Sequence, residues 1–257
     1  MGVVRSPALA PALAAALVAS TVLAACGSDQ DEGERTLTVY AAASLADTFE
    51  QIGQEFEAQH DGVRVELGSG GSADLVAQIQ EGAPADVFAS ADLATMEKLT
   101  AQGLEGGEPR VFATNTLEIV VAPGNPLGIA SLADVADAGV TLVTCAPVVP
   151  CGAAAQKAAD AAGVDLAPVS EEQSVADVLA KVTSGEADAG LVYVTDVLGA
   201  DGAVDGVDFP EASAAVNSYP IATLADSEVS DLAADFVDLV LDDAGQALLR
   251  GAGFGEP

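Results

Sequence analysis

Apolar positions along the chain alternate between short continuous runs and longer stretches with helical spacing. The first such pair predicts a strand at 36–43 followed by a helix at 44–60. In the second stretch the apolar side chains recur every three or four positions, at Leu45, Phe49, Ile52 and Phe56. A strand that leads directly into an amphipathic helix is the repeating unit of α/β proteins.

The same alternation continues to the end of the chain. Further strands are predicted at 63–67, 115–122, 140–145 and 189–194, and a turn followed by a strand at 82–90, while 214–224 is expected to carry the chain back to the first lobe. Further helices are predicted at 73–80, 91–102, 131–138, 151–162, 174–183, 227–241 and 246–253. The pattern predicts an α/β fold with mostly parallel sheets flanked by helices, in which ligands bind beyond the carboxyl ends of the strands.

The length of 257 residues allows either one large domain or two lobes of ordinary size. The strand at 115–122 ends at Pro123-Gly-Asn-Pro126, which we interpret as the first crossover between lobes. One lobe would comprise 36–121 and 216–257, and the other 122–215. The cleft between them is the expected ligand site.

Residues 1–25 are predicted to be a signal peptide. Arg5 is followed by an apolar run that is too short to span a membrane. The run ends in Leu23-Ala-Ala-Cys26, which resembles the lipobox of bacterial lipoproteins and implies lipidation of Cys26. A plain secretory signal with a chance cysteine is the alternative. The polar segment 26–35 is predicted to be a flexible tether.

Eight Lys and Arg stand against forty Asp and Glu, which gives a net charge of −32. So negative a chain repels nucleic acids and acidic membrane surfaces, so neither is an expected partner. The acidic residues are spread along the chain, as on a solvated surface. Any bound anion must therefore be held by local groups.

Cys145 and Cys151 remain once Cys26 is assigned to the anchor. Outside the cytosol two cysteines this close in sequence are expected to form a disulfide. A metal site is the alternative, but His60 is the single histidine and lies far away in sequence. We therefore expect no direct metal-ion ligands.

Several loops that precede predicted helices carry hydrogen-bond donors and no basic side chain. Ser44 can cap the helix at 44–60, with Asp47 as the carboxylate of a capping box, and Ser72 can cap the next helix after a Gly-Ser loop. Each serine is also explained by an ordinary cap or turn. No lysine follows the Gly-Ser loop, which excludes a nucleotide-binding P-loop. Amides at the start of the helix at 151 would face a ligand, and Tyr193 ends a strand, either as packing or as a donor.

Six motifs in this order resemble the periplasmic molybdate-binding proteins of ABC importers, which are two-lobed solute-binding proteins. They are Ala41-Ala-Ala-Ser44-Leu, Gly70-Gly-Ser72-Ala-Asp-Leu, Gly82-Ala-Pro-Ala-Asp86-Val-Phe-Ala-Ser90-Ala-Asp92, Val149-Pro-Cys151-Gly, Gly190-Leu-Val-Tyr193 and Gly253-Phe254. The resemblance implies a tetrahedral oxyanion held by the hydroxyls of Ser44, Ser72 and Tyr193 and the amides of Cys151 and Val175. Ser69 competes with Ser72 for the second serine, and the position at Cys151 is often alanine in the family.

The function predicted is that of a lipid-anchored extracytoplasmic receptor that binds molybdate or tungstate and delivers it to an ABC permease. It would act as a monomer, without a cofactor, and would touch the membrane only through its anchor. A sulfate- or thiosulfate-binding protein of the same fold is the nearest alternative. A hydrolase using Ser44 or Tyr193 is disfavoured, since His60 would lie roughly 24 Å along the helix from its start and no base accompanies either residue. A surface adhesion or sensory domain is a third class.

Overall fold

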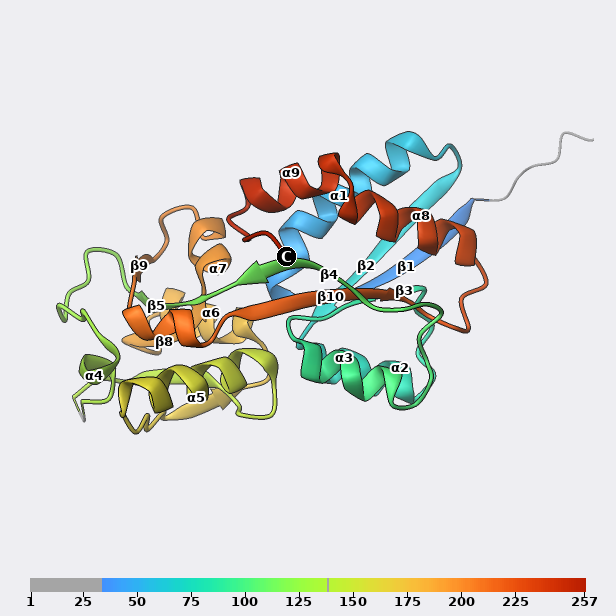
Figure 1. Ribbon diagram of the computed structural model, residues 1–257. Coiled ribbons are helices and arrows are strands. Elements are labelled where there is room, and N and C mark those ends of the chain that lie inside the picture. The colour runs from blue at the N-terminus through green and yellow to red at the C-terminus, as the bar shows by residue number, and fades with distance from the viewer. Residues whose placement is uncertain (1–33, 138) are drawn as a thin grey trace, which may run out of the picture. The chain divides into compact units, whose positions relative to one another are not determined.

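The computed structural model describes residues 34–137 and 139–257 (Figure 1). The predicted signal peptide, the lipidation site Cys26 and all but the last two residues of the predicted tether lie outside these residues. Arg35, the last tether position, is already the first residue of strand β1. In the described part of the chain, no helix combines the length and apolar character that crossing a bilayer requires.

The first lobe is built on a five-stranded sheet with the order β2-β1-β3-β10-β4. Its strands are β1 (Arg35–Ala42), β2 (Val63–Gly70), β3 (Val87–Ala89), β4 (Arg110–Asn115) and β10 (Asn217–Thr223). Strand β1 runs parallel to β2 and β3, whereas β10 runs antiparallel to β3 and β4. The fold is therefore α/β as predicted. The sheet is mixed because β10, on which the chain returns to this lobe, runs antiparallel to its two neighbours.

Helices cover both faces of this sheet. They are α1 (Ala46–Gln59), α8 (Ser230–Leu241) and α9 (Asp243–Gly251) on one face, and α2 (Ser72–Gln80) and α3 (Leu93–Thr100) on the other (Figure 1). The first group buries Phe49, Phe56 and Phe236 in one apolar cluster, and the second buries Leu75 and Leu99 in another. The predicted helical spacing thus identified the buried face of α1.

The second lobe has its own five-stranded sheet, with the order β7-β6-β8-β5-β9. Its strands are β5 (Leu117–Val121), β6 (Leu142–Cys145), β7 (Ser170–Glu172), β8 (Ala189–Tyr193) and β9 (Asp205–Val207). Its helices are α4 (Leu132–Val135), α5 (Pro150–Ala162), α6 (Val175–Thr183) and α7 (Val194–Gly199). Two short 3-10 helices, η1 (Ala43–Leu45) and η2 (Pro210–Ala214), complete the elements of residues 34–137 and 139–257. The sequence patterns did not predict β4, β7, β9 or α7.

The chain crosses between lobes earlier than predicted. Strand β5 pairs with β8 and β9, so residues 117–121 belong to the second lobe and the crossover lies at Thr116, next to Asn115. The Asn115 side chain accepts a hydrogen bond from the Thr116 N–H at 3.0 Å, where the single predicted strand at 115–122 divides. The return crossover lies between η2 and β10, close to the predicted boundary at 216.

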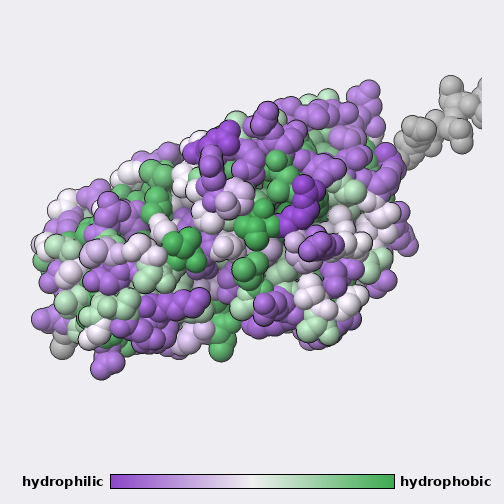
Figure 2. Space-filling view, viewed as in Figure 1, coloured by the Kyte–Doolittle hydropathy of each residue, from purple (hydrophilic) through white to green (hydrophobic). Residues whose placement is uncertain are grey.

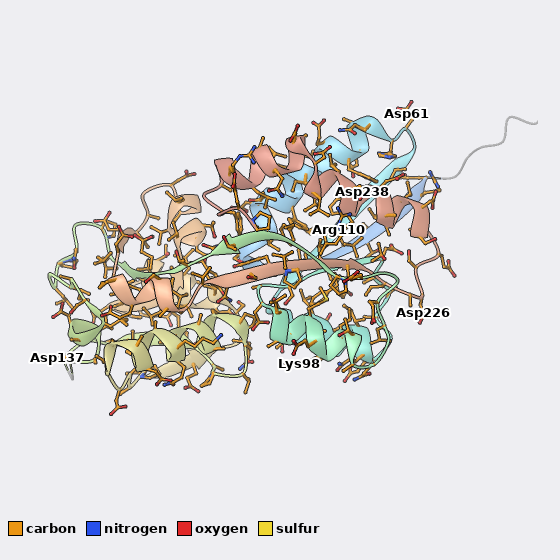
Figure 3. The ribbon with its side chains drawn as sticks, in the orientation of Figure 1. Asp61, Lys98, Arg110, Asp137, Asp226 and Asp238 are labelled. Carbon is orange, nitrogen blue, oxygen red and sulfur yellow. A yellow bond between two sulfur atoms is a disulfide. The ribbon has the colours of Figure 1, made fainter. Side chains whose placement is uncertain are left out.

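Acidic side chains lie at the periphery. Asp61, Asp137 and Asp226 are exposed at the ends and edges of both lobes, and Arg110 pairs with Asp238 at 2.8 Å on the surface of the first (Figure 3). Hydrophilic residues cover most of the visible face, with hydrophobic residues gathered in its middle (Figure 2). The spread of acidic residues in the sequence therefore corresponds to a solvated surface.

Candidate functional site: a donor-lined cavity between the lobes

The two lobes meet around a small cavity of about 20 Å³. All five residues proposed to bind the ligand line it, and they are Ser44, Ser72, Cys151, Val175 and Tyr193. None of the lining residues is Lys, Arg, Asp or Glu. A water molecule needs roughly 10–15 Å³ by the same measure, so the space is small, of the order of one or two water molecules.

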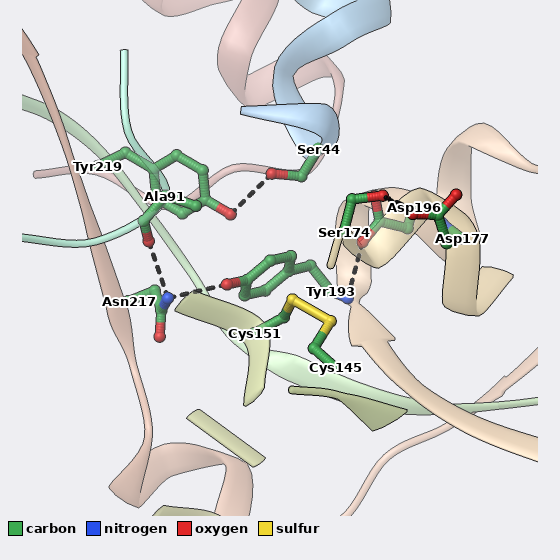
Figure 4. Close-up of a disulfide and its surroundings, with 10 residues drawn as sticks. All are labelled: Ser44, Ala91, Cys145, Cys151, Ser174, Asp177, Tyr193, Asp196, Asn217 and Tyr219. Carbon is green, nitrogen blue, oxygen red and sulfur yellow. Dashed lines mark hydrogen bonds between the residues drawn. A yellow bond between two sulfur atoms is a disulfide. The ribbon is translucent and has the colours of Figure 1, made fainter. Parts of the chain in front are cut away.

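Ser44 does not cap a helix. It lies inside η1, α1 begins only at Ala46, and neither start has a side-chain cap. Its Oγ instead lies 3.0 Å from the hydroxyl of Tyr219 (Figure 4). The predicted capping box with Asp47 is therefore wrong, because the chain leaves β1 through a 3-10 turn that presents the serine hydroxyl to the cavity.

Ser72 is the second serine at the cavity. It is the first residue of α2, whose N-cap is Gly71, and it too makes no cap hydrogen bond. Its Oγ accepts the Ala91 N–H at 3.1 Å, which leaves the hydroxyl hydrogen free to donate to a ligand. Ser69 is exposed on β2 and is not among the lining residues, so the structure brings Ser72 rather than Ser69 to the cavity.

Three helices begin at the cavity: α2, α5 and α6. Their early amides belong to Ser72, Cys151 and Val175. The first N–H groups of a helix have no intrahelical acceptor, and the helix start carries a partial positive charge. Ser174 caps α6 by accepting the Asp177 N–H, so the amide of Val175 is left for a ligand.

The predicted disulfide joins Cys145 at the end of β6 to Cys151 in the first turn of α5 (Figure 4). It closes the loop that leads into this helix. Gly152 follows directly, and a Cβ there would collide with the backbone oxygen of Ala146. The loop is therefore closely packed, and the amide of Cys151 has a fixed position at the cavity wall.

Tyr193 ends β8 with its side chain 1% exposed. Its hydroxyl accepts a hydrogen bond from Asn217 Nδ2 at 2.8 Å, and its backbone N–H donates to the Asp196 carboxylate at 2.8 Å. Burial raises the pKa of Tyr193 well above its usual value, and the neighbouring Tyr219 acts in the same direction. The hydroxyl therefore stays protonated near neutral pH and can act as a donor.

Sequence reasoning missed several residues around the cavity. Tyr219 and Asn217 on β10 hold the hydroxyls of Ser44 and Tyr193, and Gln173 lines the cavity from the second lobe. The only sequence signal for Asn217 is that a polar residue begins a strand, and this feature is too common to identify a functional residue. Asp196 was also missed: burial raises its pKa to about 7, and the Asp47 carboxylate adds to the effect.

The site is thus built of neutral donors contributed by both lobes. Hydroxyl and amide hydrogens converge from η1, α2, α5, α6 and β8, and no charged side chain lines the space. Such a constellation can hold a small acceptor-only anion, whose charge is offset by several helix starts together.

A two-lobed α/β molecule with a ligand-sized cavity where the lobes meet defines the class of solute-binding proteins. A model of the family described as bacterial extracellular solute-binding protein matches residues 37–255. The chain belongs to this family.

Named relatives agree with this assignment. The chain is 48% identical to the molybdate-binding protein ModA of Mycobacterium tuberculosis over 243 residues, covering 91% of this chain and 93% of the relative. The solved periplasmic molybdate-binding protein of Azotobacter vinelandii is similar with a TM-score of 0.72 and 26% identity, covering 86% and 99% of the two chains. The sulfate-binding protein SubI of Mycobacterium tuberculosis shares the fold with a TM-score of 0.71 at 21% identity, covering 86% of each chain.

Proposed function

We propose that the cavity binds molybdate or tungstate and that the protein delivers this oxyanion to the permease of an ABC importer. The observation that carries the proposal is an uncharged lining rich in donors, with the hydroxyls of Ser44, Ser72 and Tyr193 and the amides of Cys151 and Val175 at one cavity. The 48% identity to a molybdate-binding protein supports the choice of ligand.

The chemistry of the lining supports a fully deprotonated tetrahedral anion. Near neutral pH the oxygens of molybdate only accept hydrogen bonds, and the cavity offers them several hydroxyl and amide donors and no carboxylate. A protonated anion such as hydrogen phosphate would need an acceptor for its remaining proton. Because each helix start supplies only about half a positive charge, three of them are needed to offset much of a dianion.

The family description supports an extracellular location. We further propose that Cys26 carries a lipid anchor, that the membrane is contacted only there, and that the protein acts as a monomer without a cofactor. The metal atom would be held only through its oxygens.

The described geometry gives a hydrolase no support. His60 follows the end of α1 and stacks on Phe56 with ring centroids 4.0 Å apart, while its Nδ1 faces the Phe56 carbonyl at 2.9 Å. It is therefore engaged at the far end of the helix from Ser44. Among the described residues, the hydroxyl of Ser44 is hydrogen-bonded to Tyr219 and that of Tyr193 to Asn217, and neither is hydrogen-bonded to a histidine.

Sulfate or thiosulfate is the rival ligand, since a sulfate-binding protein shares the fold. Calorimetry of the purified mature protein against molybdate, tungstate, sulfate, thiosulfate and phosphate distinguishes the two. We expect micromolar or tighter binding of molybdate or tungstate that a hundredfold excess of sulfate does not displace. Displacement by sulfate would assign the protein to the rival class, and no binding of any oxyanion would refute the proposal.

A further inference from the structure

Asn217 is a buried amide that links the two lobes beside the proposed site. It lies at the start of β10, just after the chain returns to the first lobe, and is 6% exposed. Its Nδ2 donates to the Ala91 carbonyl of the first lobe and to the Tyr193 hydroxyl of the second, each at 2.8 Å (Figure 4). The residue therefore contacts Tyr193 without lining the ligand cavity.

The orientation of this amide follows from its partners. A carbonyl oxygen can only accept, so the side chain must present its nitrogen to Ala91, and the second hydrogen of that nitrogen then points to Tyr193. The Tyr193 oxygen is consequently an acceptor toward Asn217. Its own hydrogen must be directed elsewhere.

Two routes remain for that hydrogen, and both lead to the cavity. It can donate directly to a ligand, since Tyr193 lines the space. It can also turn toward the neighbouring Tyr219, whose hydroxyl lies 3.0 Å from Ser44 Oγ, so that Ser44 in turn donates to the ligand. In the first case Tyr193 itself offers its hydrogen to the anion, and in the second case Ser44 does so through Tyr219.

We propose that Asn217 is a positioning residue that orients the Tyr193 hydroxyl so that its hydrogen serves the bound oxyanion, directly or through Tyr219 and Ser44. This inference rests on the proposed function, because it assigns a direction to donors of the same site. An acceptor at position 217 would reverse the hydrogen bond to Tyr193, so that Tyr193 donates away from the cavity. The Tyr193 oxygen would then face the anion with a lone pair.

A double-mutant cycle by calorimetry with molybdate tests whether Asn217 acts through Tyr193. We expect Asn217→Leu to weaken binding about tenfold and Tyr193→Phe about tenfold to a hundredfold, as for lost hydrogen bonds to a charged group. The double variant should bind within about threefold of Tyr193→Phe alone. An equal weakening by Asn217→Leu in both backgrounds, or none in the wild-type background, would overturn the proposal.

A pH profile separates orientation from a merely structural role. In Asn217→Asp the buried carboxyl has a raised pKa, and it changes from acceptor to donor as it gains a proton. The ionisable groups around it are Tyr193, with Tyr219 and Asp196 beside that tyrosine, and Asp92, Glu97 and Lys157, which line a neighbouring cavity together with Asn217. We expect this variant to bind at least tenfold more weakly than Asn217→Leu at about pH 8 and to match it at about pH 5. A constant ratio across this range would contradict the proposal.

Melting temperatures of the ligand-free variants identify any that fail to fold, and Asn217→Ala replaces Asn217→Leu in that case. Wild-type binding is measured first. If wild-type protein binds no oxyanion, the proposed function fails; if it binds and the cycle is additive, only the role of Asn217 fails.

Discussion

Gly71 is the position where a single methyl group should prevent the lobes from closing on the ligand. It precedes α2 in the first lobe and faces Gln173 of the second, and both residues line the cavity. Its backbone angles, φ −59° and ψ 126°, are open to any residue. A Cβ at this position, however, would lie well inside 3.0 Å of the Gln173 backbone oxygen. Gly71→Ala therefore tests closure without backbone strain.

The expected loss can be worked from this contact. To restore an ordinary van der Waals distance the lobes must part by about 1 Å at the cavity. Donors of the second lobe placed at about 2.9 Å from an anion would then lie near 3.9 Å, beyond hydrogen-bonding distance. Loss of two charge-assisted hydrogen bonds, at about 1.5 kcal/mol or more each, weakens binding by at least about a hundredfold.

Gly70→Ala is the matched control. Gly70 lines the same cavity, but a Cβ there meets only Leu75 at 3.7 Å, an ordinary contact. We expect near wild-type molybdate affinity for Gly70→Ala in calorimetry and similar ligand-free melting temperatures for both variants. If Gly71→Ala binds as tightly as Gly70→Ala, the lobes do not need this contact distance to hold the ligand.

Two further substitutions probe the donors and the charges of the site. Ser44→Ala should weaken molybdate binding by about 1.5 to 3 kcal/mol, since it removes a hydrogen bond to a charged group; unchanged affinity in calorimetry would remove Ser44 from the site. Asp196 holds a proton in the folded state up to about pH 7, whereas the unfolded chain releases it near pH 4, so the free energy of unfolding falls as pH rises through this window. Asp196→Asn can still accept the Tyr193 N–H and should abolish that slope, stabilising the protein by about 1 to 2 kcal/mol at about pH 8 after allowance for partial exposure. Urea unfolding at both ends of the window measures this, and a wild-type slope in the variant would contradict it.

The spacing of apolar residues predicted most of the helices and strands, because this spacing depends on which face of each element is buried. Helical spacing of Phe49 and Phe56 identified the buried face of α1, and the alternation of strands and helices predicted where loops would meet. The crossover at Thr116 was misplaced since residues 117–121 are apolar apart from Glu118, and such a run carries no sign of which sheet it joins.

Chain topology explains why the cavity residues could be predicted, and tertiary contacts explain why their hydrogen-bond partners could not. Ser44 and Ser72 follow strands β1 and β2, so topology alone brings them to one edge of the sheet. Their caps were wrong because Tyr219 and Ala91 offer tertiary partners to the two hydroxyls. The contact between Asn217 and Ala91 spans 126 positions in the sequence, and no local pattern contains it.

The strongly acidic composition explains why the cavity uses neutral donors. With a net charge of −32, any arginine in the cavity would have carboxylates to pair with whenever the ligand is absent. Cations of the described chain do pair in this way: Arg35 with Asp231 and Arg110 with Asp238 on the surface. Hydroxyls and helix amides have no charge to neutralise, so they stay available when the site is empty. Closing the lobes then removes water from around them, which strengthens each hydrogen bond to a buried anion.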